Sequence, residues 1–265
     1  MNDLLQVVLL GIIEGITEFL PISSTGHLLI AEKLGLGHRS DVFNVAIQAG
    51  AILAVTVIYW QRLWSLARDL RNGENRDYAF KLIAAFFVTG VLGLIVTKLG
   101  FKLPEAITPI AWALIIGGIW IIFAERLAAK KVDNAHITWP VAIIVGLAQI
   151  VAAIFPGTSR SAAAIFAAML FGTNNRAAAT EFAFLVGIPT MFAASGKLMF
   201  DVLKHGNAAE ENWTDLGIAF IVSTITAFIA VKWLLRYIQT HRFTAFAIYR
   251  IVVGVLLLLF LPSGA

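Results

Sequence analysis

Cysteine is absent from this chain of 265 residues, and charged side chains are scarce. Without cysteine the chain has no disulfide and no thiolate-ligated metal. Charged residues make up 14% of the sequence and hydrophobic residues 59%, and the mean hydropathy is +0.85. Soluble domains have about 25% charged residues. The composition therefore excludes an ordinary soluble domain and indicates an integral membrane protein.

The formal net charge of +4 comes mostly from lysines and arginines in short connections between apolar segments. Basic residues in such connections reflect membrane orientation, since cytoplasmic loops carry an excess of them. We therefore expect membrane lipids as partners and no nucleic acid. The first apolar segment does not resemble a secretory signal, because Asn2-Asp3 precede it and Glu14 and Glu18 interrupt it.

Eight apolar segments follow one another along the chain. They cover approximately residues 4–30, 42–60, 78–97, 106–124, 139–172, 182–200, 216–234 and 245–262. A helix needs about 20 apolar residues to cross a bilayer, and the first and fifth segments are too long for one simple span. Pro21 and Pro156-Gly157 interrupt them, and broken backbone persists at membrane depth only where protein or a cavity surrounds it. The sequence predicts one all-α membrane domain over residues 1–265, with six transmembrane helices and two re-entrant helical hairpins.

The two hairpins are related by an internal repeat. Pro21 and Pro156 are 135 positions apart, and at that offset Glu14 meets Gln149 and Ser24 meets Ser159. Three spans separate the hairpins, and an odd number forces them to enter from opposite faces. The two halves, about 1–125 and 136–265, then form an inverted-topology repeat, whose binding site is expected near the midplane.

Positive charge predicts the orientation. With loops 61–81 and 125–138, Arg176 and the turn at 232–242 inside, twelve of the 20 lysines and arginines are cytoplasmic and six are outside. Arg160 and Arg250 lie within apolar segments. This excess agrees with the positive-inside rule, and the first hairpin then opens to the outside.

Glu14 and Glu18 in the first hairpin are four residues apart and share one helix face. Two carboxylates this close repel each other unless a proton or a cation lies between them. Mg²⁺ and Ca²⁺ both prefer such oxygen ligands, so a divalent cation is one interpretation. The alternative is that one carboxyl group is protonated within a polar interior.

Hydroxyl groups follow the first proline. Ser23, Ser24 and Thr25 are suited to capping a helix N-terminus, and His27 lies three residues after Ser24 on the same face. A hydroxyl beside an imidazole is a minimal activated nucleophile. A pure capping role, with His27 as an interior histidine, explains the spacing equally well.

The second hairpin is basic where the first is acidic. Thr158 and Ser159 are suited to capping an alanine-rich helix whose first turn contains Arg160. A helix N-terminus attracts anions, and a guanidinium group matches phosphate oxygens. The alternative is a purely structural ion pair between Arg160 and Glu14 or Glu18.

Four motifs together resemble one known family. They are EGITEFLPISSTGHL at 14–28, FNVAIQAGAILAV at 43–55, PGTSRSA at 156–162 and FAIYR at 246–250. The chain is similar, over nearly its whole length, to the undecaprenyl-diphosphate phosphatase family, also called bacitracin-resistance proteins. The resemblance implies hydrolysis of a C55 polyprenyl diphosphate to its monophosphate and inorganic phosphate, which recycles the carrier lipid of peptidoglycan synthesis. It also implies a divalent cation, Mg²⁺ or Ca²⁺, and a bacterial inner-membrane protein whose site opens to the periplasm.

The resemblance places the metal-binding carboxylates at Glu14 and Glu18, and the catalytic serine and histidine at Ser24 and His27. It places phosphate binding at Ser159 and Arg160, and the hydroxyls of Thr25 and Ser161 are further candidates. Ser24 is our choice of nucleophile, with His27 or Glu18 taking its proton, and a metal-activated water is the rival. The chain departs from the family pattern at Ala164, where a threonine is usual.

A secondary transporter or lipid flippase is the competing function, because inverted repeats with broken helices are common in that class. An enzyme releases inorganic phosphate in detergent, whereas a transporter needs two compartments. The sequence leaves a homodimer open.

Overall fold

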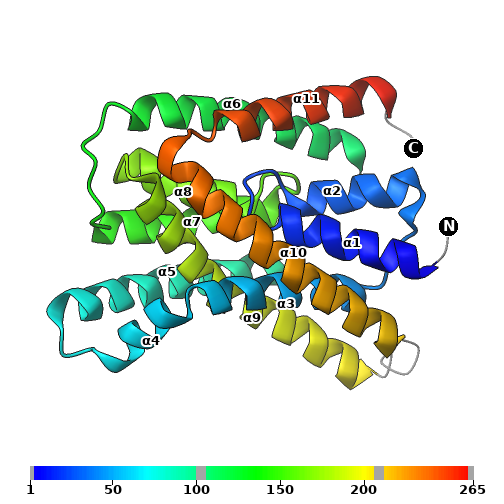
Figure 1. Cartoon of the computed structure of the whole chain (residues 1–265), viewed down its shortest axis with the longest axis horizontal. Helices are drawn as coiled ribbons and strands as arrows, with labels where there is room; N and C mark the ends of the chain where they lie inside the picture. The colour runs from blue at the N-terminus through cyan, green and yellow to red at the C-terminus, as the bar shows by residue number, and fades with distance from the viewer. Residues whose placement is uncertain (1–2, 100–105, 206–211, 262–265) are drawn as a thin grey trace.

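The protein is helical throughout the part that the computed structural model describes, which is residues 3–99, 106–205 and 212–261. The helices are α1 (Asp3–Thr17), α2 (Ser24–Ala31), the π-helical turn η1 (Glu32–Leu36), α3 (Asp41–Ile58), α4 (Trp60–Arg68), α5 (Gly73–Lys98), α6 (Ile107–Ala128), α7 (Trp139–Ile154), α8 (Arg160–Phe171), α9 (Arg176–His205), α10 (Trp213–Thr240) and α11 (Thr244–Phe260) (Figure 1).

Five of these helices, α3, α5, α6, α9 and α10, are long and apolar enough to cross a membrane. The apolar helix α11 has 17 residues, close to the lower limit of about 17 for a span. Many large apolar side chains on these helices are exposed, among them Phe87, Ile116 and Ile225. This is the expected surface of a helical multi-pass membrane protein.

The predicted breaks are confirmed. Helix α1 ends at Thr17 and α2 begins at Ser24, and Pro21 lies between them. In the second half of the repeat, α7 ends at Ile154 and α8 begins at Arg160, with Pro156 between them. Figure 1 shows that both breaks lie in the middle of the molecule.

Residues 61–81 were predicted as a loop, and that prediction is wrong. Helix α4 and the first turns of α5 occupy most of this range. The nine residues of α4, WQRLWSLAR, are amphipathic rather than continuously apolar, so hydropathy alone does not reveal them. Lys81 lies in α5, where its side chain is only 2% exposed beside Asp77.

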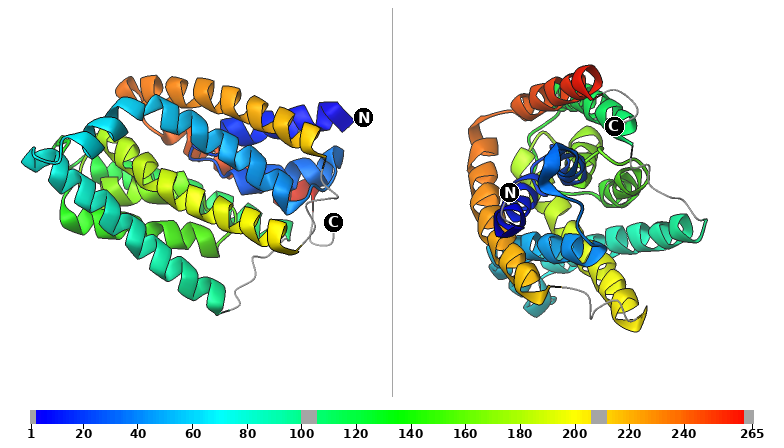
Figure 2. Two further views of the ribbon diagram at one scale, coloured as in Figure 1. Left: turned by 90° about the horizontal axis from the view of Figure 1, so that it is seen from below. Right: turned by 90° about the vertical axis from the view of Figure 1, so that its right-hand side faces the viewer.

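The helix connections collect at two ends of the molecule. The left view of Figure 2 shows α4, the α6–α7 connection and the α10–α11 turn at one end, and the start of α1 and end of α11 at the other. Hydrogen bonds brace the first end: Glu125 on α6 accepts from Arg176 on α9 and from the amide of Phe243 in the α10–α11 turn. The side chain of Thr173, after α8, donates to the Asn134 carbonyl in the α6–α7 connection.

Helix packing follows a two-fold pattern. Helix α1 packs on α10 as α7 packs on α5, and α3 packs on α10 as α9 packs on α5. Glycines make these approaches close: a Cβ atom at Gly11 would lie 2.9 Å from the Ala219 carbonyl oxygen, and one at Gly146 would lie 2.7 Å from that of Ala85.

The pair of α6 and α11 repeats this pattern within one interface. A Cβ atom at Gly118 would lie 2.7 Å from the Ala247 oxygen, and one at Gly254 would lie 2.7 Å from the Ala111 oxygen. Each residue of one contact is 136 positions from its counterpart in the other. The same contact is therefore made twice, with the two helices exchanged.

Gly146→Ala tests this close packing. We expect the added methyl group to destabilise the protein by about 1–3 kcal/mol, because it meets the α5 backbone, which cannot move like a side chain. Gly90→Ala in α5 is the control: no atom lies within 4 Å of its Cβ position, and alanine favours the helix. Thermal unfolding of the purified proteins in detergent gives the comparison. An equal midpoint for Gly146→Ala and Gly90→Ala would contradict the packing argument.

Candidate active site

Both breaks end in a serine with an unusual backbone. Ser23 and Ser159 have φ angles of 75° and 71°, and within the described residues they are the non-glycine positions with positive φ. Each is the N-cap of the helix that follows, since Ser23 Oγ accepts from the Gly26 amide and Ser159 Oγ from the Ala162 amide, both at 3.3 Å. The capping role therefore belongs to Ser23, which leaves the Ser24 hydroxyl free for another partner.

The repeat offset changes by one residue between the prolines and the caps. The N-caps are 136 positions apart, whereas the prolines are 135 apart. Ser24 therefore corresponds to Arg160 rather than to Ser159, which corrects the alignment made from the sequence. The second break has one more residue between its proline and its cap, and Gly157 there adopts a φ of 91°.

The two helix N-termini face one cavity of about 350 Å³. Its lining comes from both breaks: Glu18, Ser23, Ser24, Thr25, Ala152, Pro156, Gly157, Ser159 and Arg160. The first backbone amides of α2 and α8 have no acceptor within their own helix, and the helix dipoles add positive potential. Two helix N-termini and one guanidinium group form a site suited to an anion such as phosphate.

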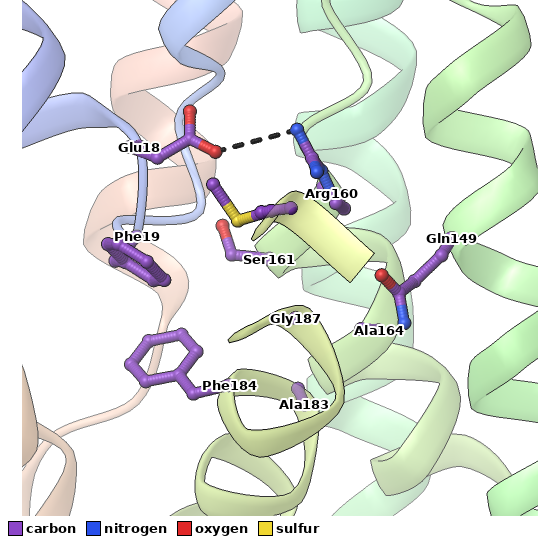
Figure 3. Close-up of a pocket in the computed structure, with 10 residues that line it drawn as sticks. Glu18, Phe19, Gln149, Arg160, Ser161, Ala164, Ala183, Phe184 and Gly187 are labelled. Atoms are coloured by element: carbon purple, nitrogen blue, oxygen red, sulfur yellow. Dashed lines mark ion pairs between the residues drawn. The ribbon is translucent and has the colours of Figure 1, made fainter. Parts of the chain in front are cut away.

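Glu18 makes polar contacts with both halves of the site. One of its carboxylate oxygens accepts a hydrogen bond from Ser24 Oγ. The other lies 3.6 Å from Arg160 Nη2 (Figure 3). The structure thus brings together three of the predicted catalytic residues, and it provides the Ser24 hydroxyl with a base. The ion pair between Arg160 and Glu18 that the sequence left open is also present.

His27 lies apart from this cluster. Its Nδ1 atom is 2.7 Å from the Ser23 carbonyl oxygen, which can only accept, so Nδ1 carries a proton. Its Nε2 atom is 2.7 Å from the Tyr249 hydroxyl, and the two rings stack with centroids 5.6 Å apart. Both ring nitrogens are therefore occupied, and of the two bases considered for Ser24, the structure pairs it with Glu18.

The predicted phosphate ligands divide into two groups. Thr25, Ser159 and Arg160 line the cavity. Ser161 lines the neighbouring cavity instead, and its Oγ atom lies 3.0 Å from Ser159 Oγ and donates to the Leu20 carbonyl oxygen at 3.1 Å, which joins α8 to the first break. Ala164, which replaces the usual threonine, lines a smaller cavity beyond the ion pair together with Gln149 (Figure 3).

Glu14 fits the role of a cation ligand. It lies one helical turn before Glu18, its side chain is 2% exposed, and its Oε2 atom has no hydrogen-bond partner in the described part of the protein. A buried carboxylate oxygen without a donor is the acceptor that a hard cation needs. The described residues contain no group of three histidine, aspartate or glutamate ligands. Two carboxylates with added water or phosphate oxygens match the coordination that Mg²⁺ usually adopts.

Arg250 on α11 is a residue whose role the sequence did not predict. Its side chain is fully buried and donates to backbone carbonyls of both breaks and of α6. An arginine inside an apolar segment is itself a signal of function or of a specific partner. The sequence shows that signal, but not the carbonyl groups that Arg250 contacts.

Comparison with known proteins identifies the family of the chain. Residues 7–256 match the family of the bacitracin resistance protein BacA. A protein named undecaprenyl-diphosphatase from Rhizobium etli (strain CIAT 652) is 70% identical over 262 residues, which cover 99% of this chain and 98% of that protein. One of the same name from Xanthomonas campestris pv. campestris (strain 8004) is 60% identical over 264 residues, which cover 100% of both chains. The chain belongs to the bacitracin resistance protein BacA family.

Proposed function

We propose that this protein hydrolyses undecaprenyl diphosphate to undecaprenyl phosphate and inorganic phosphate. The observation that carries the proposal is the shared cavity, in which two helix N-termini and Arg160 face a serine already bonded to a carboxylate. The relatives that carry the name undecaprenyl-diphosphatase support it. The reaction recycles the carrier lipid of cell-wall synthesis and gives resistance to bacitracin.

The membrane arrangement that we propose has six spans, with α11 as the sixth, and two re-entrant hairpins, α1–α2 and α7–α8. The repeated packing of α6 on α11 and the matched breaks support an inverted repeat of residues 1–125 and 136–265. The end of the molecule with α4 and the α6–α7 connection is then cytoplasmic, and the substrate cavity opens to the periplasmic side of the inner membrane.

The terminal phosphate binds between the two helix N-termini. Arg160 supplies a planar pair of donors, and the amides that begin α2 and α8 supply others. Phosphoryl transfer spreads negative charge over the oxygens of the transferred group, and donors fixed in advance stabilise that charge. Thr25 and Ser159 line the same cavity and complete the set of donors.

Ser24 is the nucleophile. Its Oγ atom attacks the terminal phosphorus while Glu18 takes the hydroxyl proton, and the bond to the bridging oxygen breaks to release undecaprenyl phosphate. A water molecule then hydrolyses the phosphoserine, and Glu18 returns a proton as inorganic phosphate leaves. In the rival mechanism a water attacks directly with Glu18 as its base, and Ser24 only binds phosphate. His27 donates a hydrogen bond from Nδ1 to the Ser23 carbonyl oxygen and so orients the start of α2.

Glu14 and Glu18 would hold a divalent cation. When bound there, Mg²⁺ or Ca²⁺ offsets negative charge on the phosphate oxygens. A transporter or flippase, the other candidate, is not favoured, because an anion-binding site alone does not require a serine paired with a carboxylate. A serine hydroxyl hydrogen-bonded to a base is the arrangement that activates a nucleophile.

Phosphate release in detergent tests the function and its cation dependence. The purified protein should release inorganic phosphate from undecaprenyl diphosphate without a sealed membrane, and a chelator should stop the release. Glu14→Gln should raise the divalent cation concentration needed for half-maximal phosphate release, because an amide binds a hard cation less well than a carboxylate does. Asp215→Asn, far from the cavity, is the control. Full activity in the presence of chelator would refute the cation site.

Arg160→Lys tests the phosphate-binding group. The lysine keeps the charge but loses the planar pair of donors, so we expect a fall in kcat on the order of 10²–10³. Circular dichroism and gel filtration show whether the variant is folded. A folded Arg160→Lys protein with near-normal turnover would remove Arg160 from the mechanism.

Substitutions of the neighbouring residues Ser23 and Ser24 distinguish nucleophilic attack from helix capping. Ser24→Ala should lower kcat on the order of 10³ or more with little loss of stability, because Ser23 provides the cap. Ser23→Ala should lower stability by about 1 kcal/mol and retain far more activity. Mass spectrometry of acid-quenched reactions should detect phosphoserine at position 24. Substantial turnover by Ser24→Ala would make water the attacking group.

Cysteine labelling tests the orientation, since the chain has no cysteine of its own. His38, in the connection from η1 to α3, and Asp133, in the connection from α6 to α7, are both exposed. These two connections lie at opposite ends of the molecule (Figure 2). A membrane-impermeant thiol reagent on intact cells should label His38→Cys, and label Asp133→Cys only after permeabilisation. The opposite result would reverse the proposed orientation.

A further inference from the structure

Arg250 is a buried cation whose hydrogen bonds in the described part of the protein all go to backbone carbonyls. Its guanidinium group donates to Gly157 and Thr158 at 2.9 Å, to Ala113 at 3.1 Å, to Pro21 at 3.2 Å and to Leu114 at 3.4 Å. Among the described residues no carboxylate lies within ion-pair distance of it. Five carbonyl oxygens therefore replace the counter-ion that a buried arginine usually has.

Three of these carbonyls belong to the breaks and lie next to the strained caps. Pro21 is two residues before Ser23, and Gly157 and Thr158 directly precede Ser159. Positive φ is unfavourable for serine and persists only where the surrounding structure holds it. One guanidinium group thus fixes the backbone that leads into both unusual serines, which are 136 positions apart in the sequence.

Fixing a carbonyl also fixes the amide beyond it. In a trans peptide the C=O group and the following N–H point in opposite directions. The Thr158 carbonyl points to Arg250, so the Ser159 amide must point away from it. The carbonyl contacts therefore determine where each half-helix begins and how its free amides are directed.

We propose that Arg250 is a positioning residue that holds both N-caps in their left-handed conformation and thereby sets Ser24 and Arg160 against the same phosphate. The effect on turnover rests on the proposed phosphatase function, whereas the effect on the two breaks does not. Arg250 itself touches none of the reacting atoms. Because Arg250 positions the first residues of both α2 and α8, the two breaks contribute to one site.

A change on α6 can displace Arg250 without altering it. A Cβ atom at Gly117 would lie 2.1 Å from Arg250 Nη2, and the three atoms nearest to it all belong to the Arg250 side chain. Gly117→Ala should therefore fold and push the guanidinium group away from the breaks. Gly90→Ala, which meets no atom, is the matched control. Arg250→Gln and Arg250→Lys form the direct series.

Hydrogen exchange measured by mass spectrometry tests the positioning without substrate. Each break contains an internal hydrogen bond, from the Ile22 amide to Leu20 and from the Thr158 amide to Phe155. Gly117→Ala and Arg250→Gln should speed exchange in peptides covering residues 18–23 and 155–159, and Gly90→Ala should not. Unchanged exchange, or faster exchange in one break only, would overturn the proposal. If Arg250→Gln does not fold, Gly117→Ala decides the question.

Kinetics provide the second measurement. A displacement of about 1 Å between reacting groups costs about 10² in rate, so kcat should fall about 100-fold in Arg250→Gln and Gly117→Ala. KM should change less than threefold or so, since the prenyl chain supplies most of the binding energy. Arg250→Lys, which keeps some donors, should recover part of the loss. Unchanged kcat alongside faster exchange in both breaks would overturn the proposed effect of Arg250 on turnover. If the wild-type protein released no phosphate, the proposed function would fail, while the exchange result would still judge the positioning.

Discussion

A helix broken in an apolar interior leaves backbone groups that only the protein or its ligand can satisfy. This constraint accounts for most of the site. Three carbonyls of the two breaks, those of Pro21, Gly157 and Thr158, are bonded to Arg250, and one amide at each helix start is bonded to the capping serine. The remaining amides at the starts of α2 and α8 face the cavity without an acceptor in their own helix. A bound phosphate group would supply the acceptors that those amides lack, so the proposed substrate would complete the hydrogen bonding at the two breaks.

The repeat supplies the same scaffold twice, and a few substitutions give its halves different chemistry. Glu14 corresponds to Gln149, and Ser24 corresponds to Arg160 once the one-residue shift after the prolines is included. The first half of the repeat thus contributes carboxylates and the Ser24 hydroxyl, and the second half contributes a cation and neutral groups. Because the breaks meet at the centre, opposite charges lie across one cavity, and Glu18 contacts Arg160 directly. A symmetric pair would have placed like charges across the cavity, which disfavours their charged forms.

Hydropathy and proline placement predicted the broken helices and the long apolar helices, because both depend on local sequence. They missed α4, whose nine residues are amphipathic, and they placed Lys81 in a loop. The side-chain contacts within the site could not be predicted from local sequence in the same way. Ser24 meets Glu18 because the chain turns back after Pro21, and His27 meets Tyr249 across 222 positions of sequence. Spacing on an ideal helix suggested Ser24 and His27 as a pair, but His27 turns towards α11. Such choices depend on tertiary packing, which residue spacing does not contain.

Unsatisfied polar groups distinguish this site from a larger cavity of about 1710 Å³ at the α4 end. Four charged residues that line the larger cavity form two ion pairs, Arg62 with Glu181 and Lys81 with Asp77. These pairs need no ligand, and they account for the burial of Lys81. Near the breaks, by contrast, Glu14 Oε2 and Gln149 Nε2 are buried and lack partners. A buried group without a partner costs stability, and it persists where a ligand or cation provides the missing contact. Cavity size alone would favour the α4 end of the molecule, whereas the unpaired carboxylate and amide groups of Glu14 and Gln149 lie near the breaks.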